Sequence, residues 1–296
     1  MKAVLAVWAL APALALSACV VTVDSQGHIT RDEKRFTVSG TPDVKLVTFD
    51  GSIEIRSWDK NEVLVEIEKR GPSQEVVDRL EIASHQDGNR VEVEVKKPEG
   101  DSVFFGIGRH TSPTARLIVT MPGEANVNAR SGDGSIRIER VRGRLDLRTG
   151  DGSIRATDIG GQMSLTTGDG SVTLDGGDGE LELETGDGGV NVAGKLAVVK
   201  IHTGDGSISF RAGDGTEMTG DWSISTGDGG ITLQLPAHFG AMLDAHTGDG
   251  SIRNELDVIA GDGGEVSRRT VRGRLGDGGR TLKVRTGDGS IRLREG

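Results

Sequence analysis

Carboxylates recur at a fixed interval through the second half of the sequence. Each lies in a Gly-Asp-Gly triplet, and five triplets are 18 residues apart, centred on Asp133, Asp151, Asp169, Asp187 and Asp205. Further triplets follow at Asp228, Asp249 and Asp288. If successive copies stack like adjacent strands, the carboxylates form a column with about 5 Å between neighbours. Neighbours at that distance repel each other by about 0.8 kcal/mol in water, and more strongly where they are partly buried.

Two arrangements could offset this repulsion. Ca²⁺ prefers carboxylate and carbonyl oxygens, so the five evenly spaced aspartates are candidate calcium ligands. In calcium-binding nonapeptide repeats the aspartate stands two places before an apolar residue, whereas Asp169 stands three places before Val172. The favoured interpretation is that each carboxylate accepts backbone N–H bonds in its own turn and faces solvent. No cofactor is therefore expected, and calcium is the alternative.

Other polar side chains repeat as well, which argues against catalysis. Arg137, Arg155 and Arg253 each follow an apolar residue, and His202 and His246 share the place before Thr-Gly-Asp-Gly. Because that place elsewhere holds Arg, Thr, Glu or Ser, the mixture is typical of a solvated face. A catalytic site needs one distinct constellation, and no nucleophile elbow, phosphate loop or zinc signature occurs. We predict that the protein is not an enzyme.

The segments between the triplets predict strands. Apolar residues alternate with polar ones, as in Val172 and Leu174, and again nine residues later in Leu181 and Leu183. Alternation of this kind indicates a strand with one buried face, and Gly-Asp-Gly is typical of a tight turn. Such a unit must stack on its neighbours to bury its apolar face.

This repeat predicts an all-β fold. We expect a β-solenoid, a single-stranded β-helix with about 18 residues per coil and two parallel sheets. A three-sided helix of hexapeptides is disfavoured, because no aliphatic residue recurs at every sixth place. The handedness preference of parallel crossovers favours a right-handed coil.

The start of the chain predicts export and lipid anchoring. Residues 1–18 carry Lys2 and an apolar run too short to cross a bilayer, which is typical of a signal peptide. The following Leu16-Ser17-Ala18-Cys19 resembles the lipobox of bacterial lipoproteins, and Cys19 is the only cysteine. We therefore expect Cys19 to carry the lipid, and several acyl chains on this residue would anchor the protein stably. Val20, where aspartate would signal inner-membrane retention, favours the outer membrane of the cell envelope.

The region before the repeats divides into two parts. Residues 19–35 are expected to be a tether of low apolar content. Residues 36–123 predict a strand-rich cap that covers the first coil, with an early copy of the repeat at Asp50-Gly51-Ser52 and a short helix capped by Ser73. Residues 101–112 are expected to form an exposed loop.

Residues 124–296 are expected to be the solenoid, stacked in sequence order. Where the spacing widens, the extra residues should form loops on one side. These loops are predicted at residues 216–220, at 236–240, and at 262–280, which contains Arg268, Arg269, Arg272 and Arg274. Charged residues at the C-terminus should blunt an open terminal edge.

Composition restricts the partners. The net charge is −10, and removal of residues 1–18 makes it one unit more negative, which disfavours nucleic acid. Sugars are usually bound on aromatic rings, but the chain has no Tyr and, beyond the signal peptide, only Trp58 and Trp222 as tryptophans. Contact with an envelope or surface protein, through a sheet face, an edge or the 262–280 loop, is more compatible with this composition than contact with a glycan.

The lipobox, the Asp50-Gly51-Ser52-Ile53 lead-in and the Thr-Gly-Asp-Gly-Ser-Ile repeats resemble the bacterial DUF4097 group, whose members are often labelled adhesins. The resemblance covers residues 36–296 and implies a lipoprotein or exported β-solenoid with no assigned reaction. We therefore expect a non-enzymatic, lipid-anchored scaffold for surface or envelope contacts. The alternative is a calcium-dependent β-helix that binds or cleaves polysaccharide.

Overall fold

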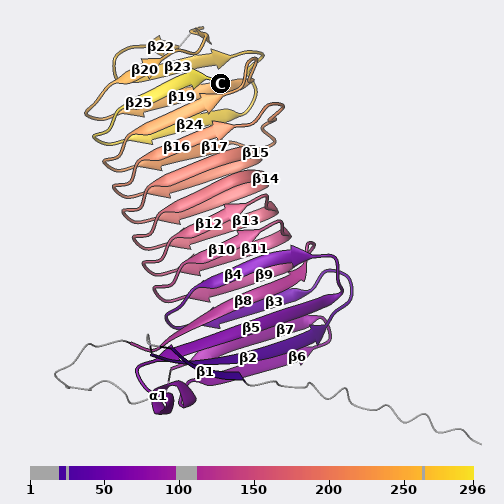
Figure 1. The fold of residues 1–296 in the computed structure, drawn as a ribbon. Coiled ribbons are helices and arrows are strands. Elements are labelled where there is room, and N and C mark those ends of the chain that lie inside the picture. Colours follow the sequence, from indigo (N-terminus) through magenta and orange to yellow (C-terminus); the bar gives the residue numbers. More distant parts are fainter. Residues whose placement is uncertain (1–19, 25–26, 98–111, 262–263) are drawn as a thin grey trace, which may run out of the picture.

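The computed structural model describes residues 20–24, 27–97, 112–261 and 264–296. This part of the chain contains 25 strands in one continuous sheet and one short helix. The strands form a tall stack with the N-terminal strands at one end and the C-terminus at the other (Figure 1). The prediction of an all-β fold is confirmed.

Seven elements build the N-terminal end of the stack: β1 (Val20–Asp24), β2 (Gly27–Thr37), β5 (Glu62–Gly71), α1 (Gln74–Asp78), β6 (Glu81–Asp87), β7 (Arg90–Lys96) and β8 (Thr114–Pro122). Antiparallel pairs run β1–β2–β5–β8 along one side, and β6 pairs antiparallel with β7 on the other. Ser73 caps α1 by accepting the Val76 amide at 3.4 Å. The predicted short helix with Ser73 at its N-cap is thus present, and strands make up the rest of this end.

The coils are built from β3 (Asp43–Thr48), β4 (Ile53–Trp58), β9 (Asn126–Ser131), β10 (Ile136–Glu139), β11 (Arg142–Thr149), β12 (Ile154–Thr157), β13 (Gly160–Thr167), β14 (Val172–Thr185), β15 (Val190–Thr203), β16 (Ile208–Ala212), β17 (Trp222–Thr226) and β18 (Ile231–Leu235). From β9 to β16 most parallel partners differ by 18 residues, as in Ile136 with Ile154 and Leu145 with Met163. Every second side chain points inward and is buried, which produces one core along the stack.

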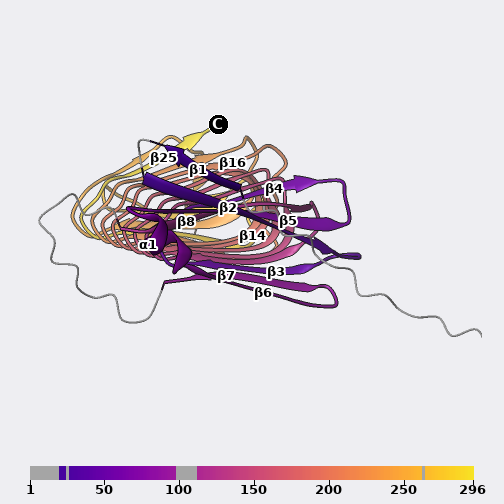
Figure 2. The ribbon, with the colours of Figure 1, turned by 60° about the horizontal axis from the view of Figure 1, so that its bottom comes forward.

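The stack has two long sides. The β10 face comprises β4, β10, β12, the first halves of β14 and β15, β16 and β18; the β11 face comprises β3, β9, β11, β13, the second halves of β14 and β15, and β17. Figure 2 shows them as the two sides of a flattened outline. The two faces do not form the two separate sheets that were predicted, because β14 and β15 run through the bend as 14-residue strands and join them.

The predicted tether is wrong for residues 27–35, because they lie within strand β2. The charged run is stabilised by opposite charges on β5. Arg31 contacts Glu68 at 3.0 Å, and Arg35 contacts Glu62 at 3.0 Å. Ile29 is buried, so the segment also has an apolar side.

The Asp50-Gly51-Ser52 copy forms a true coil. Strands β3 and β4 lie in parallel register on β9 and β10, with Ile53 beside Ile136. Their other neighbours are β7 and β8, so the early coil is inserted between segments that follow it in sequence. The predicted loop at residues 101–112 lies outside the described residues, apart from its last position.

The C-terminal coils are also stacked out of sequence order, which contradicts the prediction. The elements are β19 (Ala241–Thr247), β20 (Ile252–Asn254), β21 (Val258–Ile259), β22 (Glu265–Val266), β23 (Thr270–Leu275), β24 (Thr281–Thr286) and β25 (Ile291–Glu295). Strand β24 lies between β17 and β19, so β24, β19 and β23 extend the β11 face. Strand β25 lies between β18 and β20, so these two strands extend the β10 face. The C-terminal charges therefore do not blunt an edge, because β25 is paired on both sides.

The predicted loop at 262–280 is likewise corrected in part. It contains β22 and β23, and β23 pairs antiparallel with β19, β21 and β22 to close the end of the stack. The loops predicted at 216–220 and 236–240 are confirmed as non-strand segments. Inside this end, the rings of Phe210, Trp222 and Phe239 pack with centroids 5.2 and 5.4 Å apart.

Candidate functional site

The five predicted aspartates do form a column along one edge of the stack. Each turn is bonded to the next, because the amides of Gly150, Gly168, Gly186 and Gly204 donate to the glycine carbonyl one coil earlier. All five carboxylates are exposed. The same ladder continues through the turns at Asp228 and Asp288, and the amide of Asp249 donates to Gly287 at 2.7 Å.

The side chain of the repeated motif that bonds neighbouring coils is its threonine, not its aspartate. The buried hydroxyl of Thr167 donates to the carbonyl of Gly152 at 2.8 Å, and that of Thr185 donates to Gly170 at 3.0 Å. In several turns the same hydroxyl also accepts the glycine amide three residues on, as Thr203 does from Gly206 at 3.2 Å. A buried hydroxyl column therefore bonds consecutive coils and closes the turns. Sequence reasoning assigned the closing of each turn to the aspartate side chain, although a threonine stands before every one of these triplets except the first, where Ser131 replaces it.

No group of three or more His, Cys, Asp or Glu side chains among the described residues is placed to hold a metal ion. Calcium binding at Asp133, Asp151, Asp169, Asp187 and Asp205 stays a prediction. An exposed column with one carboxylate per coil offers any cation two carboxylates from adjacent coils and would leave its other oxygen ligands to water.

Replacing Asp169 with Asn tests the column directly. We expect the free energy of unfolding to rise by up to about 1 kcal/mol at low salt, because repulsion by the carboxylates of Asp151 and Asp187 is removed. Thermal melts of wild type and variant in EDTA and in excess Ca²⁺ measure the effect. If calcium stabilised the wild type and this gain were lost in the variant, the column would be a calcium site.

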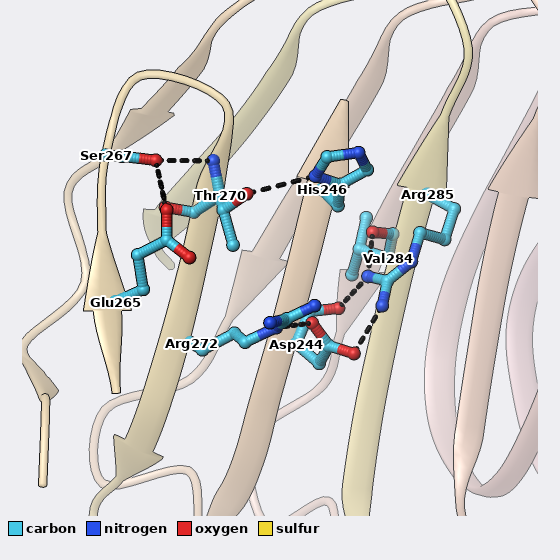
Figure 3. Close-up of polar contacts among 8 residues, drawn as sticks. All are labelled: Asp244, His246, Glu265, Ser267, Thr270, Arg272, Val284 and Arg285. Atoms are coloured by element: carbon cyan, nitrogen blue, oxygen red, sulfur yellow. Dashed lines mark hydrogen bonds and ion pairs between the residues drawn. The ribbon is translucent and has the colours of Figure 1, made fainter. Parts of the chain in front are cut away.

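Hydroxyl and imidazole groups meet at two places on the β11 face. His202 Nδ1 lies 3.1 Å from the Ser225 hydroxyl. His246 Nδ1 lies 3.0 Å from the Thr270 hydroxyl (Figure 3). In the described part of the chain neither imidazole is hydrogen-bonded to a carboxylate, which a catalytic dyad uses to orient its base. The two histidines are separated by β17 and β24, about 14 Å at the usual strand spacing. They cannot share a metal ion.

A charged cluster lies on the same face at the C-terminal end. The carboxylate of Asp244 on β19 accepts a hydrogen bond from Arg272 Nε on β23 at 2.8 Å and another from Arg285 on β24 (Figure 3). Arg285 also donates to the Asp244 carbonyl at 2.6 Å. Asp244 thus links three adjacent strands, including the inserted β24. This role was missed from sequence, because the three residues become neighbours only through the non-sequential stacking.

The pKa of Asp244 is shifted by two opposing effects. Partial burial acts to raise the pKa, but the hydrogen bonds from Arg272 and Arg285 outweigh it and hold the pKa below its usual value. The Asp244 carboxylate also raises the pKa of Arg272. The cluster is an ion-pair network that joins three strands.

Replacing Asp244 with Asn should lower the free energy of unfolding by about 1.5–3 kcal/mol at neutral pH, because two charge-assisted hydrogen bonds are lost. A depressed folded pKa contributes stability above the unfolded pKa of about 3.9, and this stability is lost as pH falls through the folded pKa. The variant should therefore lose less stability than wild type below about pH 4. Urea unfolding across pH measures both effects. Asp249→Asn is the control, because its pair with Arg269 is exposed; equal effects would contradict the assignment.

The predicted lipid site, Cys19, lies outside the described residues. The first described strand, β1, begins at the next residue, Val20, and lies at the cap end of the stack (Figure 1). In the described segments, no helix has the length and apolar character required to span a bilayer.

Comparison with known proteins places the chain in a family. No curated protein matches it significantly. Three similar solved structures are a "putative adhesin" from Bacteroides fragilis (11% identity, TM-score 0.40, 90% of this chain and 96% of that chain covered), a "putative cell adhesion protein" from Clostridium sporogenes (12%, 0.30, 90% and 100%) and a "putative lipid binding protein" from Parabacteroides distasonis (13%, 0.33, 89% and 96%).

The profile of the Toastrack DUF4097 family matches residues 43–294. The match covers both the early coil at β3–β4 and the inserted coil at β24–β25. The resemblance inferred from the Thr-Gly-Asp-Gly-Ser-Ile repeats is confirmed, and the chain belongs to the Toastrack DUF4097 family.

Proposed function

We propose that this protein is a non-enzymatic, lipid-anchored scaffold of the bacterial cell envelope, held through Cys19, that presents the faces of its stack for contacts with an envelope or surface partner. The observation that carries the proposal is the separation of the two ends. Strand β1, which follows Cys19, lies at the cap end, and β23 closes the opposite end (Figure 1). From β6 to β23 there are eleven inter-strand steps among the described strands, or about 50 Å.

The bonding between coils supports a scaffold role. Each coil is joined to its neighbours by parallel ladders on both faces, by glycine amides in the turns and by threonine hydroxyls in the core. Antiparallel strands flank the parallel coils at both ends, with β2, β5 and β6 at one end and β23 at the other. A lipid at Cys19 would hold the cap near the membrane and direct the stack away from it.

Replacing Cys19 with Ala tests the anchor. We expect the variant to move from the membrane fraction to the soluble fraction and to stop incorporating labelled palmitate. It lacks the only cysteine, and therefore the acyl chains that would anchor it. Cell fractionation and palmitate labelling measure this. Ser17→Ala, at a lipobox position that tolerates small residues, is the matched control and should stay in the membrane. Palmitate incorporation by the Cys19→Ala variant would refute the anchor.

A further inference from the structure

A groove crosses the outer side of the β10 face near the C-terminal end. It consists of two adjoining hollows of about 570 and 350 Å³ that share Asn191 and Ser209. The groove runs across the strands, from Thr173 on β14 to Arg253 on β20. The strand order along it is β14, β15, β16, β18, β25 and β20, which corresponds to about 24 Å. Its shape suits an extended chain that lies along the stack.

The charge of this groove is opposite to that of the protein. Four arginines line it, Arg211, Arg253, Arg292 and Arg294, against one carboxylate, Asp175, in a chain of net charge −10. Arg253 is paired with Glu255 at 2.8 Å, and Arg294 donates to the neutral Gln234 at 3.1 Å. Across the described residues, Arg211 and Arg292 contact no carboxylate.

The register of the strands places like charges side by side. Arg292 on β25 is the direct neighbour of Arg253 on β20. Like charges on adjacent strands destabilise a sheet, so an anion bound here would reduce the repulsion between the two arginines. Arginine is well suited to this task, because its planar guanidinium can bind a carboxylate or sulfate group through two hydrogen bonds.

The remaining lining indicates what carries the anions. Serine, threonine, asparagine and glutamine side chains fill the positions between the arginines, and they match the hydroxyl groups of a sugar chain. No aromatic ring lines either hollow, and Trp222 is buried in the core, so the groove offers no platform for stacking neutral sugars. We infer that the groove binds a linear anionic polysaccharide that carries carboxylate or sulfate groups. This inference rests on the proposed scaffold function and names a partner for it; it needs no calcium and does not use the aspartate column.

The test compares polymers on the full-length lipoprotein in detergent. Affinity electrophoresis with polygalacturonate, dextran sulfate, neutral dextran and duplex DNA, together with calorimetry using inorganic phosphate, separates carboxylate, sulfate, neutral and phosphate chemistry. We expect binding to polygalacturonate or dextran sulfate, unchanged by EDTA, weakened by salt and absent for dextran. Failure to bind either acidic polysaccharide, or tighter binding to DNA or phosphate, would overturn the inference.

Paired variants locate the site. Arg211→Gln with Arg292→Gln should weaken binding at least about tenfold through the loss of charge-assisted hydrogen bonds. Arg137→Gln with Arg155→Gln is the matched control, because these arginines lie on the same face outside the groove, directly beside each other. Equal losses in both pairs would refute a specific site. Thermal melts verify folding. Membrane fractionation of the Arg211/Arg292 variant should be unchanged, so failure of this inference is distinguishable from failure of the proposed anchor.

Discussion

Replacing Gly188 with Ala should destabilise the protein by about 3 kcal/mol or more, whereas the same change at the next residue, Gly189, should be nearly neutral. A β-carbon on Gly188 would overlap the backbone carbonyl of Gly170 in the coil below, and it would also crowd the Thr185 hydroxyl at 2.8 Å. That carbonyl accepts the Thr185 hydroxyl at 3.0 Å, so it cannot move away without breaking a hydrogen bond between coils.

The control variant, Gly189→Ala, changes the next residue in the chain. For a β-carbon on Gly189 the nearest atom would be the Ser207 carbonyl oxygen at 3.9 Å, an ordinary contact distance. Alanine there also reduces the freedom of the unfolded chain, which offsets any small loss. Urea unfolding of both variants measures the difference. Equal stabilities would show that neighbouring coils are not packed as closely as the structure indicates.

The period of the sequence was sufficient to predict much of this fold. An 18-residue spacing of glycines with alternating apolar residues predicts parallel strands in register, because only that arrangement stacks like on like. It also predicted the aspartate column, which requires only that successive turns superimpose. The cap was predicted in outline, but β2 was not, because its charged residues appear solvated until the opposite charges on β5 are placed beside them.

The order of the coils could not be predicted from the period, because the repeats are too similar to specify it. Residues 247–253 and 286–292 have the same sequence, Thr-Gly-Asp-Gly-Ser-Ile-Arg. Either segment fits on β18 equally well by these seven residues. The Asp244 cluster and the arginine groove both depend on which segment is chosen. Arg285 reaches Asp244, and Arg292 lies beside Arg253, only because the last coil is inserted.

The residue after the shared segment distinguishes the two coils. It is Leu293 in one and Asn254 in the other, and both follow the strand to a position beside the core. Leu293 is fully buried between Leu233 and Asn254. Asn254 lies at the end of the stack, where its side-chain amide donates to the Leu256 carbonyl at 3.0 Å and accepts from the Leu256 amide at 3.2 Å. An amide in the internal position would lose water without a ready partner. We therefore attribute the coil order on this face to Leu293.

Replacing Leu293 with Asn should lower the free energy of unfolding by about 4 kcal/mol, from lost apolar burial and an unsatisfied amide. Arg292→Asn, one residue earlier and exposed, should change it by less than about 0.5 kcal/mol. Urea unfolding measures both. If the two variants were equally stable, burial at position 293 would not hold the last coil in place.

A disulfide reporter shows whether the order itself depends on this residue. In a Cys19→Ala background, Thr232→Cys with Arg292→Cys should oxidise, because these residues are direct partners on β18 and β25. Thr232→Cys with Arg253→Cys should not, because β25 lies between them and the separation of about 10 Å exceeds the reach of a disulfide. Adding Leu293→Asn should lower the yield of the first pair. If the disulfide yield of the second pair rose at the same time, the two coils would be exchanging places, since their seven shared residues make either one compatible with β18. Equal oxidation of both pairs without that substitution would instead mean that the order is not fixed in the native protein, and the Asp244 cluster would then be a property of only one of two stackings.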